Sequence, residues 1–438
     1  MSSEASPGVT RREFVKTTAG LAAAAAAGVS PSVIARTAHG GGSDEIKVAV
    51  IGCGGRGTGA AMDALNASPR VRIWAMSDAF KDRIDSSIGW LTGGDGVSDE
   101  VRSRVTVDPS RRFVGFEGYK DAIASGVGMV ILAQPPHFRP AHFVEAVRAG
   151  KHVFMEKPVG VDPVQIREVM AAASVADEKK LGVVTGTQRR HEACYLEAMK
   201  RVRDGAIGRI VGASVYWNQG GLWSHDRRPE WSDLEYQMRN WLYYAWLSGD
   251  HIVEQHIHNL DVMNWAMGGP PVSCSGMGGR QVRTDARYGH VFDHFALQYV
   301  YPGGVVGQSY CRQIDGTKGD VREVIVGTEG ELHTTSGYAE IKGKNPWRFS
   351  GKQTSPYLQE HIDLITSLES GRPINEAKTT AESTLTAIMG RMAAYTGQEV
   401  TWDFVTRTSG LKLGPERYEL GPALAVDEVA MPGRTRLI

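Results

Sequence analysis

Cysteine is scarce in this chain of 438 residues, which contains only Cys53, Cys194, Cys274 and Cys311. Their scattered spacing matches neither a zinc knuckle nor a disulfide framework. An excess of charge of one sign is also missing, because 49 lysines and arginines balance 49 aspartates and glutamates. Without a basic excess, we expect no nucleic-acid partner and no anionic membrane surface as a partner. Internal repeats and coiled-coil heptads are absent from the sequence.

The remaining composition is that of an ordinary globular protein. Hydrophobic residues make up 42% of the chain and charged residues 22%, as in most folded domains. The length predicts two domains. The 52 glycines and 10 tryptophans are more informative, because tight turns and aromatic surfaces both serve sites for small ligands.

The N-terminal segment has the pattern of an export signal. Residues 10–16 read TRREFVK, and an apolar run follows at residues 19–29. That run is too short to span a bilayer. The paired Arg11 and Arg12 before it resemble a twin-arginine signal, whose pattern is S/T-R-R-x-F-x-K. We therefore expect residues 1–38 to be a signal peptide and linker. The mature protein is then periplasmic or otherwise extracytoplasmic, without a stable membrane span.

A glycine turn follows the first expected strand, Ile46–Ile51. A helix-compatible stretch at residues 58–67 comes next, so the order strand, turn and helix is the context that G-x-G-x-x-G requires. The first glycine permits the tight turn, the second lets the backbone approach a pyrophosphate, and the third lets the helix pack closely. The turn therefore predicts contacts to a dinucleotide from Gly52, Gly54, Gly55, Arg56 and Gly57.

A second expected strand, residues 71–76, is followed by Asp78. A carboxylate at this place accepts hydrogen bonds from the adenosine ribose and repels a 2′-phosphate, which favours NAD over NADP. Lys81 and Arg83 follow closely and weaken that preference.

Two more strands are expected at residues 129–133 and 151–155, with a helix at residues 141–149 between them. This alternation indicates a doubly wound parallel sheet. Such sheets bind ligands at the carboxyl ends of their strands. We therefore expect further cofactor contacts from Gln134, Pro135, His137, Glu156 and Lys157.

The glycine turn, the segment GKHVFMEKP at residues 150–158 and the segment EQHIHNLD at residues 254–261 resemble the Gfo/Idh/MocA family of oxidoreductases. The resemblance covers nearly all of the chain after residue 44. It implies an α/β fold with a Rossmann domain at residues 44–170. A substrate-binding α/β domain with an open, mostly antiparallel sheet follows at residues 171–438. Arg139 stands where the family often has a histidine, and Glu254 and His256 replace an aspartate and a glycine of its D-x-G-x-H motif.

The resemblance places the catalytic groups at Lys157 and on an expected helix at residues 250–267. An ammonium at residue 157 can bind the reacting hydroxyl and stabilise a developing alkoxide. Helical spacing brings Glu254, His258 and Asp261 to one face. His258 can take the alcohol proton. Glu254 or Asp261 is then expected to orient the imidazole, with binding of a substrate hydroxyl as the alternative for Asp261.

The second domain is expected to bind the substrate. Residues 185–191 resemble the family segment that reaches into the active cleft, where Gln188 and Arg190 either donate to substrate hydroxyls or form salt bridges within the protein. The tryptophans of residues 216–246 either face a sugar or pack in the core. From residue 291 onward the pattern is rich in strands, including a hairpin at residues 292–312. The open face of that sheet is expected to be a homo-oligomer interface.

A metal site is an alternative to these roles, because His251, Glu254, His256 and His258 lie close together in the sequence. On one helix, however, His256 and His258 point about 200° apart. The spacing matches neither H-E-x-x-H nor H-x-x-E-H. We therefore predict no metal.

Three functions are compatible with these residues. The first is an NAD(P)-dependent oxidoreductase that moves a hydride between a tightly held nicotinamide cofactor and a sugar or polyol hydroxyl. An exported protein finds no pool of nicotinamide cofactor outside the cytoplasm. It must therefore bind the cofactor before export, and a second substrate must return the bound cofactor to its starting redox state. The second is a redox-neutral, NAD-dependent glycoside hydrolase that acts by oxidation, elimination and re-reduction, with His256 as an additional base. The third is a binding protein that tolerates loss of Lys157 and His258.

Overall fold

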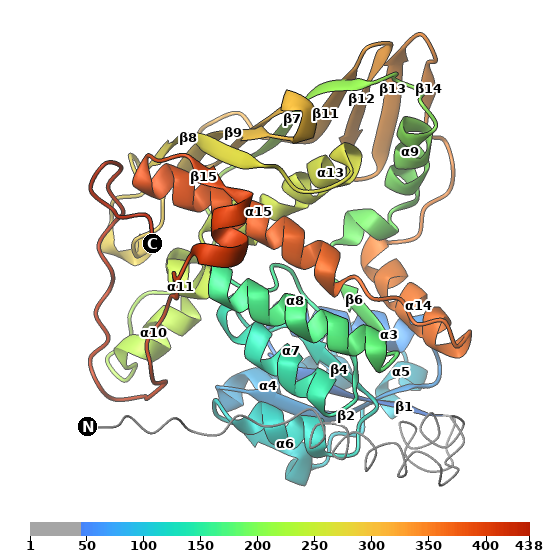
Figure 1. Cartoon of the computed structure of the whole chain (residues 1–438). Helices are drawn as coiled ribbons and strands as arrows, with labels where there is room; N and C mark the ends of the chain where they lie inside the picture. The colour runs from blue at the N-terminus through green and yellow to red at the C-terminus, as the bar shows by residue number, and fades with distance from the viewer. Residues whose placement is uncertain (1–44) are drawn as a thin grey trace, which may run out of the picture. The chain divides into compact units, whose positions relative to one another are not determined.

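The computed structural model describes residues 45–438, so the expected signal peptide at residues 1–38 lies outside the described residues. Two sheets organise the described part (Figure 1). Sheet A has six parallel strands in the order β3-β2-β1-β4-β5-β6, and sheet B has nine strands in the order β14-β13-β12-β11-β7-β10-β9-β8-β15. Among residues 45–438, no helix combines the length and the apolar character that crossing a membrane demands.

Sheet A is the expected Rossmann sheet. Its strands are β1 (Ile46–Ile51), β2 (Val71–Asp78), β3 (Arg112–Val114), β4 (Met129–Leu132), β5 (His152–Met155) and β6 (Val183–Thr185). They read as short apolar runs because both faces of the sheet are covered by helices. Those helices are α3 (Gly55–Ala67), α4 (Lys81–Gly93), α5 (Asp99–Ser103), α6 (Gly118–Ala124), α7 (Arg139–Arg148) and α8 (Pro163–Glu178).

The first domain extends further than the sequence predicted. Helix α8 begins where Asp162 accepts a hydrogen bond from the backbone amide of Gln165 at 2.9 Å, a regular N-cap followed by proline. It then runs without interruption past residue 170 and leads to β6, which pairs in parallel with β5. Sheet A therefore ends at Thr185, beyond residue 170, where we expected the first domain to end.

Sheet B is open and mostly antiparallel, as expected; only the β7–β10 pair is parallel among its pairings in residues 45–438. Its strands are β7 (Ile210–Gln219), β8 (Ser273–Gly279), β9 (His294–Val300), β10 (Val306–Gln313), β11 (Asp320–Gly327), β12 (Gly330–Thr335), β13 (Tyr338–Gly343), β14 (Trp347–Arg348) and β15 (Val400–Thr401). In β9, buried Phe295 and Leu297 alternate with exposed Ala296 and Gln298. One face of the sheet is therefore covered and the other is exposed.

Helices join the two sheets. They are α9 (Ala193–Arg203), α10 (Asp233–Arg239), α11 (Ala245–Ser248), α12 (His251–Glu254), α13 (Ile257–Met267), α14 (Pro356–Glu369) and α15 (Ala377–Thr396). Figure 1 shows α15 between sheet B and α8, while α14 returns to pack on α3. The C-terminal helices thus cover the Rossmann domain as well as the second sheet.

The single helix expected over residues 250–267 is wrong, because α12 ends at Glu254 and α13 starts at Ile257. The amide of His256 donates five residues back, to the carbonyl of His251 at 3.1 Å, and the amide of His258 only three back, to Gln255 at 3.2 Å. A wide turn followed by a tight one interrupts the regular helical ladder. Glu254 and His258 therefore do not share one helical face.

Candidate active site

A cavity of about 620 Å³ lies at the carboxyl ends of the strands of sheet A. Gly52 follows β1, and Asp78 is the last residue of β2. Gln134 comes after β4, and Lys157 comes after β5. The part of the chain after sheet A contributes another wall, which includes Gln188, Trp223, Glu254, His258 and Tyr357. The volume lies within the range of sites for cofactors and small ligands.

The glycine turn forms one end of this cavity. Gly52 has φ +90, and a Cβ there would lie 2.3 Å from the backbone nitrogen of Gln134. A Cβ on Gly57 would lie 1.8 Å from the carbonyl oxygen of Gly52, so the third glycine serves the close packing of α3. A Cβ on Gly54 would meet no atom within 4 Å, and no side chain caps the first amides of α3. The helix N-terminus is thus open to an anionic group.

Asp78 lies beside this turn. Its Oδ2 accepts from the amide of Cys53 at 2.7 Å and its Oδ1 from the amide of Phe80 at 3.0 Å. Burial raises the pKa of Asp78, and the two hydrogen bonds oppose that rise. Arg83 lines the cavity, whereas Lys81 pairs with Asp85 at 2.5 Å. Of the two basic residues noted in the sequence, Arg83 alone lies in the cavity wall.

Several polar atoms in the wall make no hydrogen bond to residues 45–438, although Nη2 of Arg56 lies 3.8 Å from Oδ2 of Asp63. Both amide atoms of Gln134, Oε1 of Gln188 and Nη2 of Arg56 are buried without a hydrogen bond. Because buried polar groups normally have partners, these atoms fit a polar ligand. Together with the open helix N-terminus and Asp78, this donor and acceptor set fits a nicotinamide dinucleotide.

His137 and Arg139, which come after β4, differ in their relation to the cavity. His137 does not line the cavity, because its Nε2 lies 2.6 Å from the hydroxyl of Tyr418 and its Nδ1 lies 3.1 Å from Nε2 of Gln165. The predicted cofactor contact from His137 therefore does not match the structure. Arg139 does line the cavity and donates to the carbonyl oxygens of Gln134 and Pro158, which joins the turns after β4 and β5. Burial lowers the pKa of Arg139 to about 10.

The ammonium of Lys157 is held by Glu254. Nζ donates to the main-chain oxygen of Glu254 at 2.5 Å and to its Oε1 at 3.0 Å. The helix break after residue 254 places this carboxylate toward the lysine, so the expectation that Glu254 orients His258 is wrong. An ammonium has three donors, and two of them are directed at Glu254. One donor remains for a ligand in the cavity.

His258 lies in the same cavity wall as Lys157. Its ring stacks on Trp217, with centroids 5.6 Å apart and an angle of 23° between the planes. Burial lowers the pKa of His258 well below its usual value, and the positive charges of Lys157 and Arg189 lower it further. The imidazole is therefore neutral near pH 7 and is able to accept a proton.

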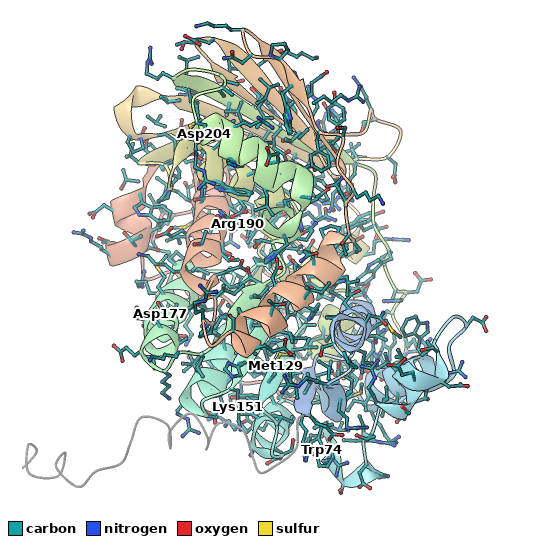
Figure 2. The ribbon with its side chains drawn as sticks, turned by 90° about the vertical axis from the view of Figure 1, so that its right-hand side faces the viewer. Trp74, Met129, Lys151, Asp177, Arg190 and Asp204 are labelled. Atoms are coloured by element: carbon teal, nitrogen blue, oxygen red, sulfur yellow. The ribbon has the colours of Figure 1, made fainter. Side chains whose placement is uncertain are left out.

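Asp261 and Arg190 pair with each other instead of facing a ligand. Nε of Arg190 lies 2.8 Å from Oδ2 of Asp261, whose Oδ1 also accepts from Ser383 at 2.7 Å. Asp261 is 1% exposed, and neither residue lines the cavity. The structure therefore pairs Asp261 with Arg190 and not with His258, and it does not bring either residue to the cavity where we expected substrate contacts. In Figure 2, Arg190 lies between Asp204 at the end of α9 above and Met129 of sheet A below.

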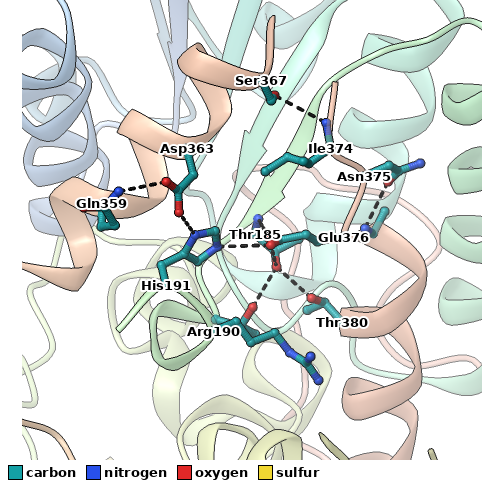
Figure 3. A network of polar contacts seen from close by, with 12 residues as sticks. Thr185, Arg190, His191, Gln359, Asp363, Ser367, Ile374, Asn375, Glu376 and Thr380 are labelled. Atoms are coloured by element: carbon teal, nitrogen blue, oxygen red, sulfur yellow. Dashed lines mark hydrogen bonds and ion pairs between the residues drawn. The ribbon is translucent and has the colours of Figure 1, made fainter. Parts of the chain in front are cut away.

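A charged histidine anchors the segment that carries Gln188. Nδ1 of His191 lies 2.7 Å from Oδ2 of Asp363, and its Nε2 lies 3.1 Å from Oε1 of Glu376 (Figure 3). Although burial opposes it, these two carboxylates raise the pKa of His191 to about 10. Glu376 also accepts from the amide of Thr185 at 3.0 Å. This network fixes the 3-10 turn Gln188–His191 between α14 and α15.

Tyr357 lies on α14 and lines the cavity, although no sequence pattern pointed to it as a site residue. Its hydroxyl lies 3.5 Å from Nε2 of Gln188, and its ring centroid lies 4.8 Å from the guanidinium carbon of Arg56. Arg56 in turn pairs with Glu156, which fills the space beside Gly186. Tyr357 is separated from the glycine turn by about 300 residues, so no local pattern connects them.

The histidines near α12 do not converge on one point. His256 is fully buried with its Nε2 2.8 Å from the hydroxyl of Ser309, and Nδ1 of His251 lies 3.0 Å from Oδ1 of Asp250. In the described part of the chain, no group of three or more histidine, cysteine or acidic side chains is placed to hold a metal ion.

Two family profiles match the chain. The profile described as oxidoreductase family, NAD-binding Rossmann fold, matches residues 46–185. The profile described as GFO/IDH/MocA C-terminal domain matches residues 195–333. Together they cover more than half of the chain.

Curated relatives are distant. A scyllo-inositol 2-dehydrogenase (NAD(+)) of Bacillus subtilis is 23% identical over 291 residues, which are 66% of this chain and 73% of that protein. A 2,7-anhydro-N-acetylneuraminate hydratase of Escherichia coli is 25% identical, over 48% of this chain and 56% of the hydratase. A scyllo-inositol 2-dehydrogenase (NADP(+)) of Bacillus subtilis is 26% identical, over 41% of this chain and 46% of that protein.

Solved structures share the fold. The scyllo-inositol dehydrogenase of Lactobacillus casei with bound NAD(H) and scyllo-inositol has a TM-score of 0.62 to this chain at 18% identity. The match covers 82% of this chain and 99% of that protein. The same arrangement of a Rossmann sheet and an open second sheet therefore occurs in both.

Proposed function

Because the chain belongs to the Gfo/Idh/MocA family, we propose that it is an oxidoreductase that moves a hydride between a tightly held nicotinamide cofactor and a hydroxyl of a sugar or polyol. One observation carries this proposal: Lys157 and His258 line the same cavity as the glycine turn and Asp78. Relatives named as inositol dehydrogenases support a polyol as the substrate class.

The open amides of α3, Asp78 and Gln134 are the groups that would hold the dinucleotide. When bound, its nicotinamide would supply the hydride acceptor or donor. Asp78 favours NAD, because its carboxylate repels a 2′-phosphate. Relatives named for NAD(+) and for NADP(+) both occur, so the preference of this chain is a proposal drawn from its own residues.

The remaining donor of the Lys157 ammonium binds the substrate hydroxyl and stabilises the negative charge that develops on its oxygen. Glu254 positions that ammonium through two oxygens, at 2.5 and 3.0 Å. Neutral His258 accepts the hydroxyl proton, and returns it in the reverse direction. Trp217 holds the imidazole plane by stacking.

A redox-neutral glycoside hydrolase is the second candidate. One relative is named as a hydratase, and a hydratase by its name adds water without net oxidation. This name supports a redox-neutral reaction as the second candidate. The base that we expected for it, His256, is however fully buried against Ser309 and outside the cavity wall. Elimination would therefore have to use His258 or Lys157.

Denaturing the purified protein and identifying released NAD(H) or NADP(H) tests the proposal first. The loaded protein is then offered inositols and aldoses while the absorbance of reduced nicotinamide is followed. A polyol that reduces the bound cofactor, with the response lost in Lys157→Ala and His258→Ala, supports the proposal. Steady aglycone release from chromogenic glycosides without added nicotinamide supports the second candidate. If no substrate gives either response, both candidate functions are contradicted.

We also propose that residues 1–38 direct export by the twin-arginine route, because TRREFVK precedes a short apolar run. In a bacterium that has this route, the native protein should be found outside the cytoplasm after fractionation. The double substitution Arg11→Lys and Arg12→Lys should leave it inside, since the route depends on the paired arginines. Export of the double variant at the native rate would contradict the proposal.

We further propose that a second copy of the chain binds the exposed face of sheet B. Ala296 and Gln298 of β9 are exposed on this face, and Met277 of neighbouring β8 is 77% exposed. Light scattering coupled to size exclusion should show an oligomer, and Met277→Glu together with Gln298→Glu should dissociate it. A native monomer would contradict this proposal.

A further inference from the structure

The segment at residues 222–241, here named the clasp, lies over one end of the cavity. Trp223, His225 and Arg239 of the clasp line the same cavity as Asp78 and Arg83. Burial lowers the pKa of His225, and the charges of Arg83, Arg239 and Arg228 lower it further. The clasp is therefore next to the Asp78 end of the cavity. His258 and Lys157 line the same cavity, and Trp217 stacks on His258 without lining it.

One ion pair fastens the clasp to the Rossmann domain. Nη1 and Nη2 of Arg239 each lie 3.0 Å from an oxygen of Asp82, at the start of α4. The guanidinium carbon lies 4.4 Å from the ring centroid of Phe80. The Arg239 side chain is only 12% exposed, whereas that of Asp82 is 58% exposed. A two-pronged pair of this kind is directional as well as attractive.

The clasp is also built to keep its shape. Oδ1 of the buried Asn240 accepts from the amide of His225 at 2.7 Å, and its Nδ2 donates to the carbonyl of His225 at 3.1 Å. The hydroxyl of Tyr243 lies 3.0 Å from the carbonyl oxygens of Leu222 and Trp223. These hydrogen bonds join the start of the clasp to its end.

Residues 409–438, here named the tail, contact the clasp. The amide of Leu424 donates to Oδ2 of Asp233 at 3.1 Å, and its carbonyl accepts from Nε2 of Gln237 at 3.1 Å. An apolar cluster joins the three parts, and it includes Phe80, Phe116 and Phe138 of the Rossmann domain, Leu234 and Met238 of the clasp, and Leu413, Tyr418 and Leu424 of the tail.

We propose that the clasp completes the adenosine subsite and retains the dinucleotide, with the Arg239–Asp82 pair as the contact whose opening limits cofactor release. This inference rests on the proposed function, which places the adenosine ribose at Asp78. The indole of Trp223 and the imidazole of His225 offer flat faces on which a purine base stacks. Because both faces come from the second half of the chain, the adenosine moiety leaves only when the clasp moves.

Rapid mixing that follows NADH fluorescence measures the release rate in the full-length protein. Asp82→Asn removes the ionic contact without altering a residue of the cavity wall, and release should accelerate about three- to tenfold. Asp85→Asn is the matched control, because Asp85 lies on the same helix and pairs only with Lys81 among the described residues. Added salt should accelerate release from the native protein and not from Asp82→Asn.

ADP-ribose, which lacks the nicotinamide ring, locates the effect. Asp82→Asn should weaken ADP-ribose and NADH by the same factor, and Trp223→Ala should weaken both about tenfold. Equal release rates for Asp82→Asn and Asp85→Asn would overturn the clasp while leaving the proposed function intact. A loss confined to NADH would also overturn it, because the segment would then act at the nicotinamide end. Absence of binding of either ligand to the native protein would refute the proposed function, and the clasp with it.

Discussion

Replacing Gly54 by alanine separates cofactor binding from folding. The backbone at Gly54 has φ −72 and ψ −174, an extended conformation open to alanine, and a Cβ would meet no atom within 4 Å. Folding should therefore be unaffected. The new methyl group would occupy the open space at the N-terminus of α3, where the pyrophosphate is proposed to lie. A misplaced methyl in a close contact costs about 1–3 kcal/mol, so NADH affinity should fall about 5- to 150-fold.

Two other glycines of α3 serve as controls. A Cβ on Gly57 would lie 1.8 Å from the carbonyl oxygen of Gly52, so Gly57→Ala must push the helix from the turn and lower the melting temperature as well as the affinity. A Cβ on Gly59 would lie 3.6 Å from Nη1 of Arg56, an ordinary contact, so Gly59→Ala should keep both. Titration of NADH fluorescence and thermal unfolding give the two readouts. Native NADH affinity in Gly54→Ala would refute the phosphate cradle.

Three more predictions follow from single side chains. His258→Gln removes the proton acceptor, so kcat should fall about 10²- to 10⁴-fold while NADH affinity measured by titration stays native; an unchanged kcat would exclude His258 as the base. Arg83→Ala removes a basic side chain of the cavity wall that acts on Asp78. The affinity for NADPH should fall about tenfold and that for NADH little; equal losses would contradict a position of Arg83 beside the 2′-phosphate. His361 is fully buried against Phe154, and burial, with the charges of Arg56 and His191, lowers its pKa to about 3. Since the unfolded histidine titrates near pH 6.5, the stability present above that pH is lost as the pH falls toward 3, and at pH 5 the loss is about 2 kcal/mol. His361→Leu should therefore show a smaller drop in melting temperature between pH 7 and pH 5 than the native protein, and a drop of native size would argue against a neutral buried His361.

The Rossmann half could be predicted well because its signals are local. Strand β1 has the expected bounds, Ile46–Ile51, and β2, β4 and β5 fall within two residues of the expected ranges. Apolar runs bounded by a glycine turn or by a strand-end carboxylate need no knowledge of distant residues. Strand β6 lies beyond residue 170, where we expected the first domain to end, and it joins sheet A through its pairing with β5. The residues around 183 do not specify which strand they pair with.

Residues 250–267 show how helical periodicity can mislead, because the structure has two helices, α12 and α13, where one was expected. Spacing of four and three residues would place Glu254, His258 and Asp261 on one face, and this holds only in an unbroken helix. The break at residues 255 and 256 turned Glu254 toward Lys157. Asp261 found its partner in Arg190, whose guanidinium reaches it from a segment about 70 residues earlier.

The sequence by itself determined the class of fold and the glycine turn, because strand ends and glycine turns are local events with few alternatives. Lys157 and His258 were expected from the family resemblance, and both line the cavity. Tertiary structure alone decided which acid pairs with which base, that Trp223 lines the cavity while Trp217 stacks on His258, and that clasp residues share the cavity wall with Asp78. Ion pairs and ring contacts of this kind join residues tens to hundreds of positions apart. Their partners are chosen by the packing of whole helices and sheets, since buried charges and rings must find neighbours wherever the completed core places them.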